Sequence, residues 1–328
     1  MKLYSNGKLL ITGEYLVLNG AKAFALPLSC GQSLNYQITG DNLIKWNSYN
    51  SNNNIWFSTI INKDNLKVIE SSDFTISEKL DQILKCIRNH NPEFLNKGGC
   101  SIETKLNFDK DWGLGTSSTL ISNLSKLANV DPYIILKETF GGSGYDIACS
   151  NVNHPILYSI NNGKRIIQKV EFNPSFKNNL YFIYLNKKQD SSNEILRYTN
   201  LKISSSDINK ITSISKQITK SKNQQEFNLL LDSHEEILSF ILKRDTIKKE
   251  LFSDFEGSIK NLGAWGGDFI LSSSESNPSD YFISKGFNRV ITYNDMVNNK
   301  NLIIDNFCTR FKNFRDKRRN SFNFSISH

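Results

Sequence analysis

The stretch Asp111-Trp-Gly-Leu-Gly-Thr-Ser-Ser-Thr119 leads into an apolar run and predicts a glycine- and hydroxyl-rich loop that opens a helix. The helix is predicted from apolar residues at helical spacing: Leu120, Ile121, Leu124, Leu127 and Ala128. A helix N-terminus offers unpaired N–H groups and positive dipole character, and a loop without bulky side chains lets a polyphosphate approach them. The predicted phosphate-binding residues are Gly113, Leu114, Gly115, Thr116, Ser117 and Ser118.

Two common nucleotide motifs do not fit this loop. A Walker A loop ends in Gly-Lys-Ser/Thr, and no lysine follows Gly115. A dinucleotide fingerprint needs a third glycine and an acidic residue on the next strand, which the stretch lacks. An ordinary helix start with a hydroxyl N-cap remains an alternative on the local pattern alone.

A second glycine-rich stretch, Gly141-Gly-Ser-Gly-Tyr-Asp146, places a carboxylate directly after a turn. A structural turn aspartate is one interpretation of Asp146, and a general base is the other. Because a phosphate loop and a nearby carboxylate are the minimum requirement for phosphoryl transfer, the two stretches together favour the second interpretation.

Length and composition are typical of a soluble enzyme of about two domains. The chain has 328 residues and a mean hydropathy of −0.40, with no apolar stretch approaching the ~18 residues of a membrane span. Lys8 and Glu14 interrupt the first apolar run, so no signal peptide is predicted. The five cysteines are scattered without metal-binding spacing, which predicts reduced thiols, no zinc site and a cytoplasmic location: Cys30, Cys86, Cys100, Cys149 and Cys308.

The net charge of +8 is partly concentrated in the segment 312–319. A charge run near a chain end is usually a solvated segment, so neither nucleic acid nor membrane is the expected partner. We expect instead a small-molecule substrate, and a monomer or homodimer.

Periodicity predicts an α+β chain with two lobes. A β region is expected through residue 70, followed by a helix after Ser77. The further predicted strands cover 102–108, 155–160, 165–170, 180–185, 269–271 and 289–293, and two helices cover 208–218 and 227–241.

Two other segments extend the pattern: 5–20, which contains Gly7-Lys8 and Gly13-Glu14, and the glycine-rich 261–269. In this order, with the two stretches above, they resemble the GHMP kinase superfamily. The resemblance implies the two-lobed GHMP kinase fold, with an N-terminal lobe like domain 2 of ribosomal protein S5 and a ferredoxin-like C-terminal lobe. It also implies an ATP-binding domain over 1–190 and a C-terminal domain over 191–328.

The resemblance implies ATP and Mg²⁺ as cofactors, with the loop 113–118 around the phosphates. Ser117 would bind Mg²⁺. Glu138 is the nearest candidate for the second metal ligand, although the family spacing is not kept here. Asp146 would accept or orient the proton of the acceptor hydroxyl, and Lys8 would lie beside it. The substrate loop would comprise Gly263, Ala264, Gly266 and Gly267.

The segment around Asp146 favours the mevalonate and phosphomevalonate branch. Homoserine or sugar kinases, a diphosphomevalonate decarboxylase-like enzyme and a non-catalytic nucleotide- or nucleic-acid-binding relative remain alternatives. Asp268 departs from the family pattern, in which this loop is a run of small residues. A carboxylate near phosphates is unfavourable unless a cation lies beside it. His234 is expected to be a satisfied, partly buried histidine. The net charge leads us to expect a basic cleft that favours an anionic acceptor.

Overall fold

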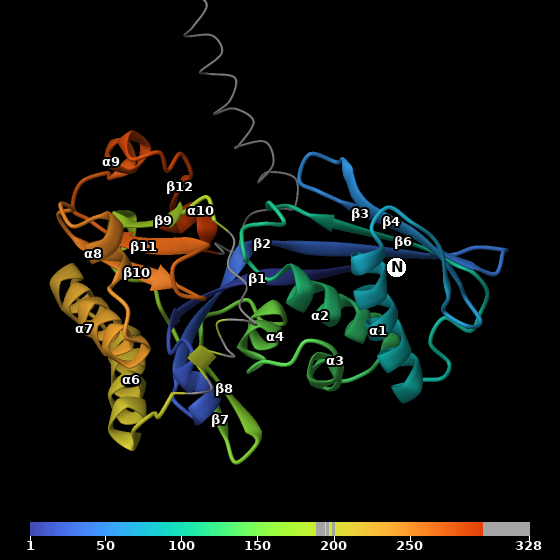
Figure 1. Cartoon of the computed structure of the whole chain (residues 1–328), viewed down its shortest axis with the longest axis horizontal. Coiled ribbons are helices and arrows are strands. Elements are labelled where there is room, and N and C mark those ends of the chain that lie inside the picture. The colour runs from blue at the N-terminus through green and yellow to red at the C-terminus, as the bar shows by residue number, and fades with distance from the viewer. Residues whose placement is uncertain (188–193, 195–196, 199–200, 298–328) are drawn as a thin grey trace, which may run out of the picture.

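The computed structural model describes residues 1–187, 194, 197, 198 and 201–297, which form two lobes (Figure 1). The basic segment 312–319 and Cys308 lie outside these residues. None of the helices that the structure describes is both long and apolar enough to cross a membrane.

The larger lobe is built on an eight-stranded sheet in the order β5-β4-β3-β6-β2-β7-β8, with β1 paired to β2. All its pairs are antiparallel except β3 with β6. Its strands are β1 (Lys2–Thr12), β2 (Ala23–Ile38), β3 (Leu43–Tyr49), β4 (Ile55–Asn62), β5 (Val68–Ser71), β6 (Cys100–Leu106), β7 (Ile156–Asn161) and β8 (Lys164–Lys169). The β region expected through residue 70 is confirmed.

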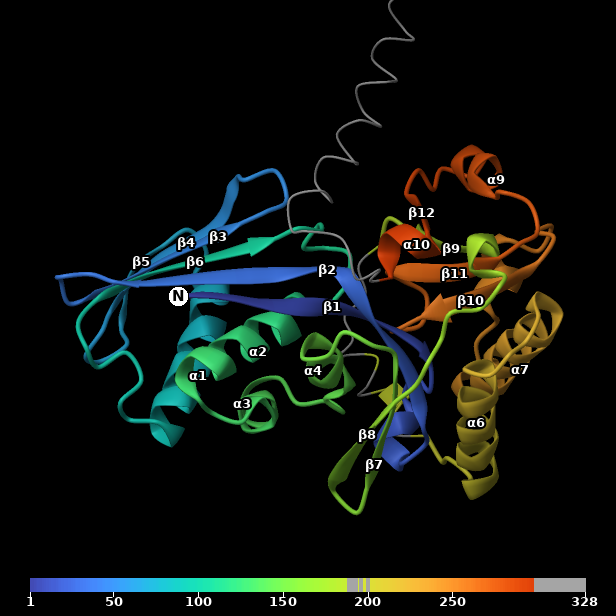
Figure 2. The ribbon, with the colours of Figure 1, turned by 180° about the vertical axis from the view of Figure 1, so that it is seen from behind.

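Four helices lie on one face of this sheet: α1 (Phe74–His90), α2 (Thr116–Ala128), α3 (Pro132–Thr139) and α4 (Tyr145–Ser150) (Figures 1 and 2). The prediction that α1 follows Ser77 is wrong by about one turn. The helix begins earlier because the Asp73 carboxylate accepts a hydrogen bond from the N–H of Ile76 and caps it. Ser77 is instead buried within the first turn.

The smaller lobe holds a four-stranded antiparallel sheet in the order β10-β11-β9-β12. Its strands are β9 (Leu180–Tyr184), β10 (Ser258–Leu262), β11 (Phe269–Ser273) and β12 (Val290–Thr292). Its helices are α6 (Ser205–Ile218), α7 (Gln224–Leu242), α8 (Ile247–Leu251), α9 (Ser279–Ser284) and α10 (Tyr293–Met296). β9 precedes residue 190 yet pairs in this sheet; the domain division at residue 190 stays a prediction.

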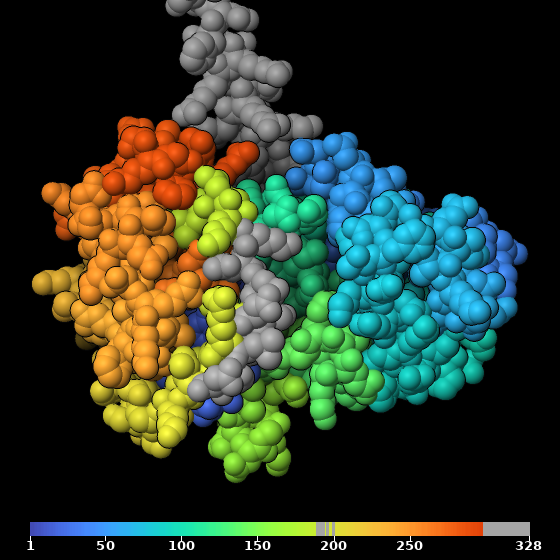
Figure 3. Space-filling model, viewed as in Figure 1, coloured from blue at the N-terminus to red at the C-terminus, as the bar shows by residue number. Residues whose placement is uncertain are grey.

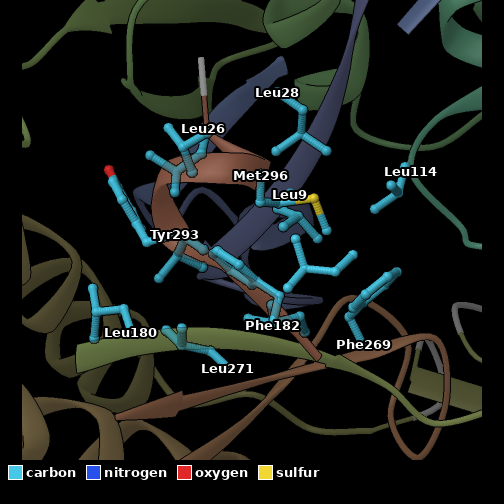
Figure 4. Close-up of a cluster of buried hydrophobic side chains, with 14 of the residues drawn as sticks. Leu9, Leu26, Leu28, Leu114, Leu180, Phe182, Phe269, Leu271, Tyr293 and Met296 are labelled. Carbon is cyan, nitrogen blue, oxygen red and sulfur yellow. The ribbon is translucent and has the colours of Figure 1, made fainter. Parts of the chain in front are cut away.

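A continuous apolar cluster joins the two sheets. Leu9, Leu26 and Leu28 from β1 and β2 face Phe182 of β9 and Phe269 of β11 (Figure 4). In the space-filling view the orange residues of the smaller lobe and the green and blue residues of the larger lobe occupy opposite sides of the molecule (Figure 3). The two lobes therefore share buried apolar surface, and the predicted two-lobed α+β class is confirmed.

A buried charge cluster also links the lobes. Lys260 of β10 places its Nζ 2.7 Å from Oε1 of Glu14, which follows β1, and 3.2 Å from Oε1 of Glu235 on α7. Nζ also donates to the carbonyl of Asn261 at 2.8 Å. All three charged side chains are buried. One cation therefore serves two carboxyl groups that water does not reach.

We expect Lys260→Met to lower the free energy of unfolding by about 3–5 kcal/mol, because it leaves two buried carboxyl groups without their cation. Denaturant unfolding measures the effect. Lys45→Met is the matched control, since it breaks the solvent-exposed pair with Asp41 and should cost at most about 1 kcal/mol. Equal unfolding midpoints for the two variants would contradict the assignment.

Candidate active site

Strand β1 holds the glycine loop through its backbone. The N–H of Lys8 donates a hydrogen bond to the carbonyl of Leu114 at 3.0 Å. The Lys8 side chain then runs along the loop, because a Cβ added to Gly115 would lie 3.2 Å from Lys8 Cγ. The two sequence motifs predicted from residues 5–20 and 111–119 are thus in direct contact.

The start of α2 fits an anionic ligand. Its N-cap is Gly115, with φ of 101° and no capping side chain, so the hydroxyl-capped helix start is not what forms here. The Thr116 Oγ1 is buried without a hydrogen-bond partner, and Ser117 is exposed on the first turn. A Cβ at Gly115 would lie 2.8 Å from Ser118 Oγ. Uncapped N–H groups and free hydroxyls beside a bare glycine suit phosphate oxygens.

Asp146 lies on the first turn of α4, whose N-cap is Gly144 with φ of 83°. Lys8 Nζ lies 5.5 Å from the centre of the neighbouring Tyr145 ring. Burial raises the pKa of Asp146, while the Lys8 ammonium and the N–H of Ile147 oppose this and leave it above its ordinary value. The Lys8 ammonium is thus close enough to Asp146 to influence its pKa, while the predicted catalytic roles of the two residues stay predictions.

Lys8 is the cation that several groups of the site share. Burial alone would lower its pKa, but Tyr145 and then Asp146 outweigh burial. Asp268 contributes in the same direction, so the pKa of Lys8 is raised above its ordinary value. The ammonium therefore stays charged, as a group that counters negative charge requires.

Asp268 closes the site from the smaller lobe. Its backbone has φ of 53°, and its N–H donates to the carbonyl of Lys187 at 2.7 Å. Its carboxylate lies against Gly113, where an added Cβ would be 2.3 Å from Oδ2. Any side chain at Gly113 would thus displace Asp268. The cation required beside this carboxylate is Lys8, whose pKa Asp268 helps to raise.

A cleft that is partly open to solvent lies beside these groups. Its lining includes Lys8, Glu14, Ser143, Tyr145, Gly263, Ala264 and Asp268. Among the described residues, the charged groups of this lining are one cation, Lys8, and two carboxyl groups, Glu14 and Asp268. The expectation of a basic cleft is therefore wrong for the described part of the chain.

Side-chain hydrogen bonds hold the C-terminal glycine loop in place. The N–H of Gly266 donates to Oδ1 of Asn261 at 2.9 Å, and the N–H of Trp265 donates to the Tyr15 hydroxyl at 2.8 Å. Of the predicted substrate residues, Gly263 and Ala264 line the cleft, whereas Gly266 makes this internal bond and Gly267 is buried. Tyr15 thus connects the two lobes.

Glu14 is a candidate functional residue to which the sequence pattern assigned no role. Burial raises its pKa to about 7, although Lys260 lowers it in part. Glu14 contributes to the lining of the cleft, but its Oε2 is buried without a hydrogen-bond partner. A buried polar atom without a partner is unusual in a folded protein, which makes Glu14 a residue to test.

His234 lies 3.3 Å from that oxygen through Nε2, but the contact is not an ion pair. Burial, with Lys260 adding to it, holds the pKa of His234 well below its ordinary range, so the ring is neutral. Its Nε2 accepts the N–H of Gly13 at 2.9 Å. The histidine is fully rather than partly buried and its Nδ1 has no hydrogen-bond partner, so the expectation of a satisfied, partly buried histidine is wrong.

Glu138 lies in a different group of side chains. Its Oε1 is 2.9 Å from Nε2 of His90, and its Oε2 accepts a hydrogen bond from the Cys86 thiol at 3.2 Å. These bonds, that of His90 first, lower the pKa of Glu138. The structure brings Glu138 together with α1, and its predicted role beside Ser117 in binding Mg²⁺ stays untested.

No protein-family model matches the sequence, and no curated protein matches it. Several solved structures are similar to the structure of this chain. The mevalonate kinase of Methanococcus jannaschii superposes with a TM-score of 0.66 at 19% identity, covering 89% of this chain and 96% of that one. The phosphomevalonate kinase of Streptococcus pneumoniae, in complex with phosphomevalonate and AMPPNP, superposes with a TM-score of 0.65 at 14% identity. The match covers 89% of this chain and 99% of that one.

The galactokinase of Lactococcus lactis, complexed with galactose, gives a TM-score of 0.63 at 14% identity, covering 87% of this chain and 88% of that one. The neighbours share the GHMP kinase architecture, so the resemblance inferred from the four motifs is confirmed at the level of the fold. The chain has the two-lobed GHMP kinase fold.

We expect Gly115→Ala to weaken ATP binding at least about tenfold, or roughly 1.4 kcal/mol, because its Cβ would crowd Ser118 Oγ and Lys8 at the helix start. Gly286→Ala is the matched control: its φ of 91° is also positive, but its Cβ meets nothing within 4 Å. Calorimetric titration measures both. Unchanged affinity in a folded Gly115→Ala protein would place the phosphate site elsewhere.

Proposed function

We propose that the protein is an ATP-dependent kinase that transfers the γ-phosphoryl group to a hydroxyl group of a small molecule. The observation that carries the proposal is the position of Lys8. Its backbone is bonded to the glycine loop, and its ammonium lies beside Asp146 at the open cleft. A phosphate-binding loop, a cation and a carboxylate in one place are what phosphoryl transfer requires.

In this proposal the loop 113–118 and the first turn of α2 hold the ATP phosphates through N–H groups and hydroxyls. The exposed Ser117 hydroxyl is the candidate Mg²⁺ ligand, since this hard cation prefers oxygen. The metal would neutralise charge on the phosphates. Glu138 is not needed for this assignment.

Asp146 accepts the proton of the acceptor hydroxyl as the oxygen attacks phosphorus, or orients that hydroxyl. A pKa raised by burial makes its carboxylate a better base than an exposed aspartate. Lys8 keeps the carboxylate ionised and counters the negative charge on the transferred group.

The cleft lining supports an acceptor that is rich in hydroxyl groups. Its carboxyl groups, Glu14 and Asp268, suit hydroxyl groups as hydrogen-bond donors, and Lys8 is the cation of the described lining. We therefore propose mevalonate as the first acceptor to test and phosphomevalonate as the second, with homoserine and hexoses as the alternatives. The titles of the solved neighbours include mevalonate and phosphomevalonate kinases, which supports this order of testing.

We expect Asp146→Asn to lower kcat by about 10²–10⁴-fold, because the amide cannot accept the proton, while ATP affinity changes little. ADP release with the best acceptor measures turnover, and calorimetry measures binding. A variant that keeps more than about a third of wild-type turnover would remove Asp146 from the mechanism.

A pH profile separates this role from a structural one. Since the pKa of Asp146 is raised, activity should fall as the pH drops through that raised value. Lys8→Met removes the ammonium that lowers the pKa, so the acid limb of its residual activity should move to higher pH. An acid limb that does not move would show that Lys8 does not act on Asp146.

We expect mevalonate to give the highest kcat/KM in an ADP-release screen of mevalonate, phosphomevalonate, homoserine and hexoses.

Glu14→Gln should raise the KM for the best acceptor more than the KM for ATP, because Glu14 lines the cleft proposed to hold the acceptor. Mg²⁺-ATP should also raise the melting temperature of the wild-type protein. If no acceptor releases ADP and ATP does not stabilise the protein, it is a non-catalytic relative.

A further inference from the structure

Cys86, His90 and Glu138 form a compact group outside the candidate active site. Cys86 and His90 lie four residues apart on α1, so both face the same side of the helix. Glu138 reaches them from the last turn of α3, which packs beside α1 (Figures 1 and 2). One sulfur, one ring nitrogen and one carboxylate oxygen lie within 4.8 Å of one another.

The group combines burial with access. Cys86 is buried at 5% exposure, whereas the side chains of His90 and Glu138 are 37% and 45% exposed. An ion can therefore reach the two outer ligands from solvent and contact the thiol behind them. Ligands fixed on two packed helices also need little rearrangement to bind.

The donor set selects the kind of metal. A thiolate, an imidazole and a carboxylate are the ligands of Zn²⁺, whereas Ca²⁺ and Mg²⁺ prefer oxygen alone. A tetrahedral zinc ion with bonds of about 2.0–2.3 Å places its ligand atoms roughly 3.3–3.7 Å apart. The contacts Sγ–Oε2 at 3.2 Å and Nε2–Oε1 at 2.9 Å need to widen by a few tenths of an ångström. The widest separation among the three ligand atoms is at most 4.8 Å and needs to close by up to about 1 Å.

We propose that Cys86, His90 and Glu138 form a transition-metal site, with Zn²⁺ as the preferred ion and a water molecule in the fourth position. In the metal-free protein the Cys86 thiol keeps its proton and donates a hydrogen bond to Oε2 of Glu138. On binding, a metal–sulfur bond replaces the S–H bond and the proton leaves to solvent. No redox change is involved.

Such an ion would fasten the end of α3 to α1. α3 is followed by the glycine turn 141–144 and then by α4, which carries Asp146. The site therefore lies one short connection before the candidate base. The proposal does not depend on the proposed kinase activity, because metal binding is measured without turnover.

The test uses Co²⁺, whose thiolate complexes absorb in the near ultraviolet, titrated into the full chain with Cys308→Ser to remove the thiol that lies outside the described residues. We expect one equivalent to give the thiolate-to-cobalt band, and Zn²⁺ to displace it. Melting curves with and without Zn²⁺ should show stabilisation. Absence of both the band and the stabilisation would overturn the proposal.

Variants identify the ligands. Cys86→Ser should remove the band. His90→Ala and Glu138→Gln should each weaken Co²⁺ binding by more than the roughly 10–100-fold that loss of an outer-shell partner costs. Glu78→Gln is the control, because it removes the same charge from an exposed position of α1, the helix that carries Cys86 and His90. Equal affinity in Glu78→Gln and Glu138→Gln, or a band that survives in Cys86→Ser, would overturn the assignment.

Discussion

The candidate site depends on the position of Lys8, which is bonded to the glycine loop through its backbone and carries the charge that the site shares. Its backbone pairs with Leu114, so β1 and the loop cannot move apart without breaking a buried hydrogen bond. Its ammonium faces Tyr145, Asp146 and Asp268. A single residue near the N-terminus thereby couples the phosphate loop, the candidate base and the smaller lobe.

A second lysine, Lys260, is the shared cation of the buried charge cluster that links the lobes. Lys260 neutralises Glu14 and Glu235, which would otherwise not tolerate burial at the junction of the lobes. Burial raises the pKa of Glu14 to about 7 although Lys260 lowers it in part, and one oxygen of Glu14 has no hydrogen-bond partner. The structural cluster and the lining of the cleft thus share Glu14.

Local patterns in the sequence predict much of this structure. The glycine loop, α2 and the apolar faces of the long helices follow from spacing, and the helix start at Asp73 was missed because Ser77 is an equally good capping residue. Residues brought together across the lobes could not be predicted. Neither the contact of Glu14 with Lys260, 246 positions away, nor that of Cys86 with Glu138 has any local signal.

The charge balance at the cleft limits what the site can bind. Lys8 already faces Asp146 and Asp268, so an ATP molecule adds negative charge to a site with little free positive charge among the described residues. The uncapped end of α2 supplies part of the compensation through its dipole. A phosphorylated acceptor would add further charge to a cleft that Glu14 and Asp268 line, whereas a hydroxyl group adds none. Electrostatics therefore favours an acceptor that meets this cleft with hydroxyl groups rather than with phosphate.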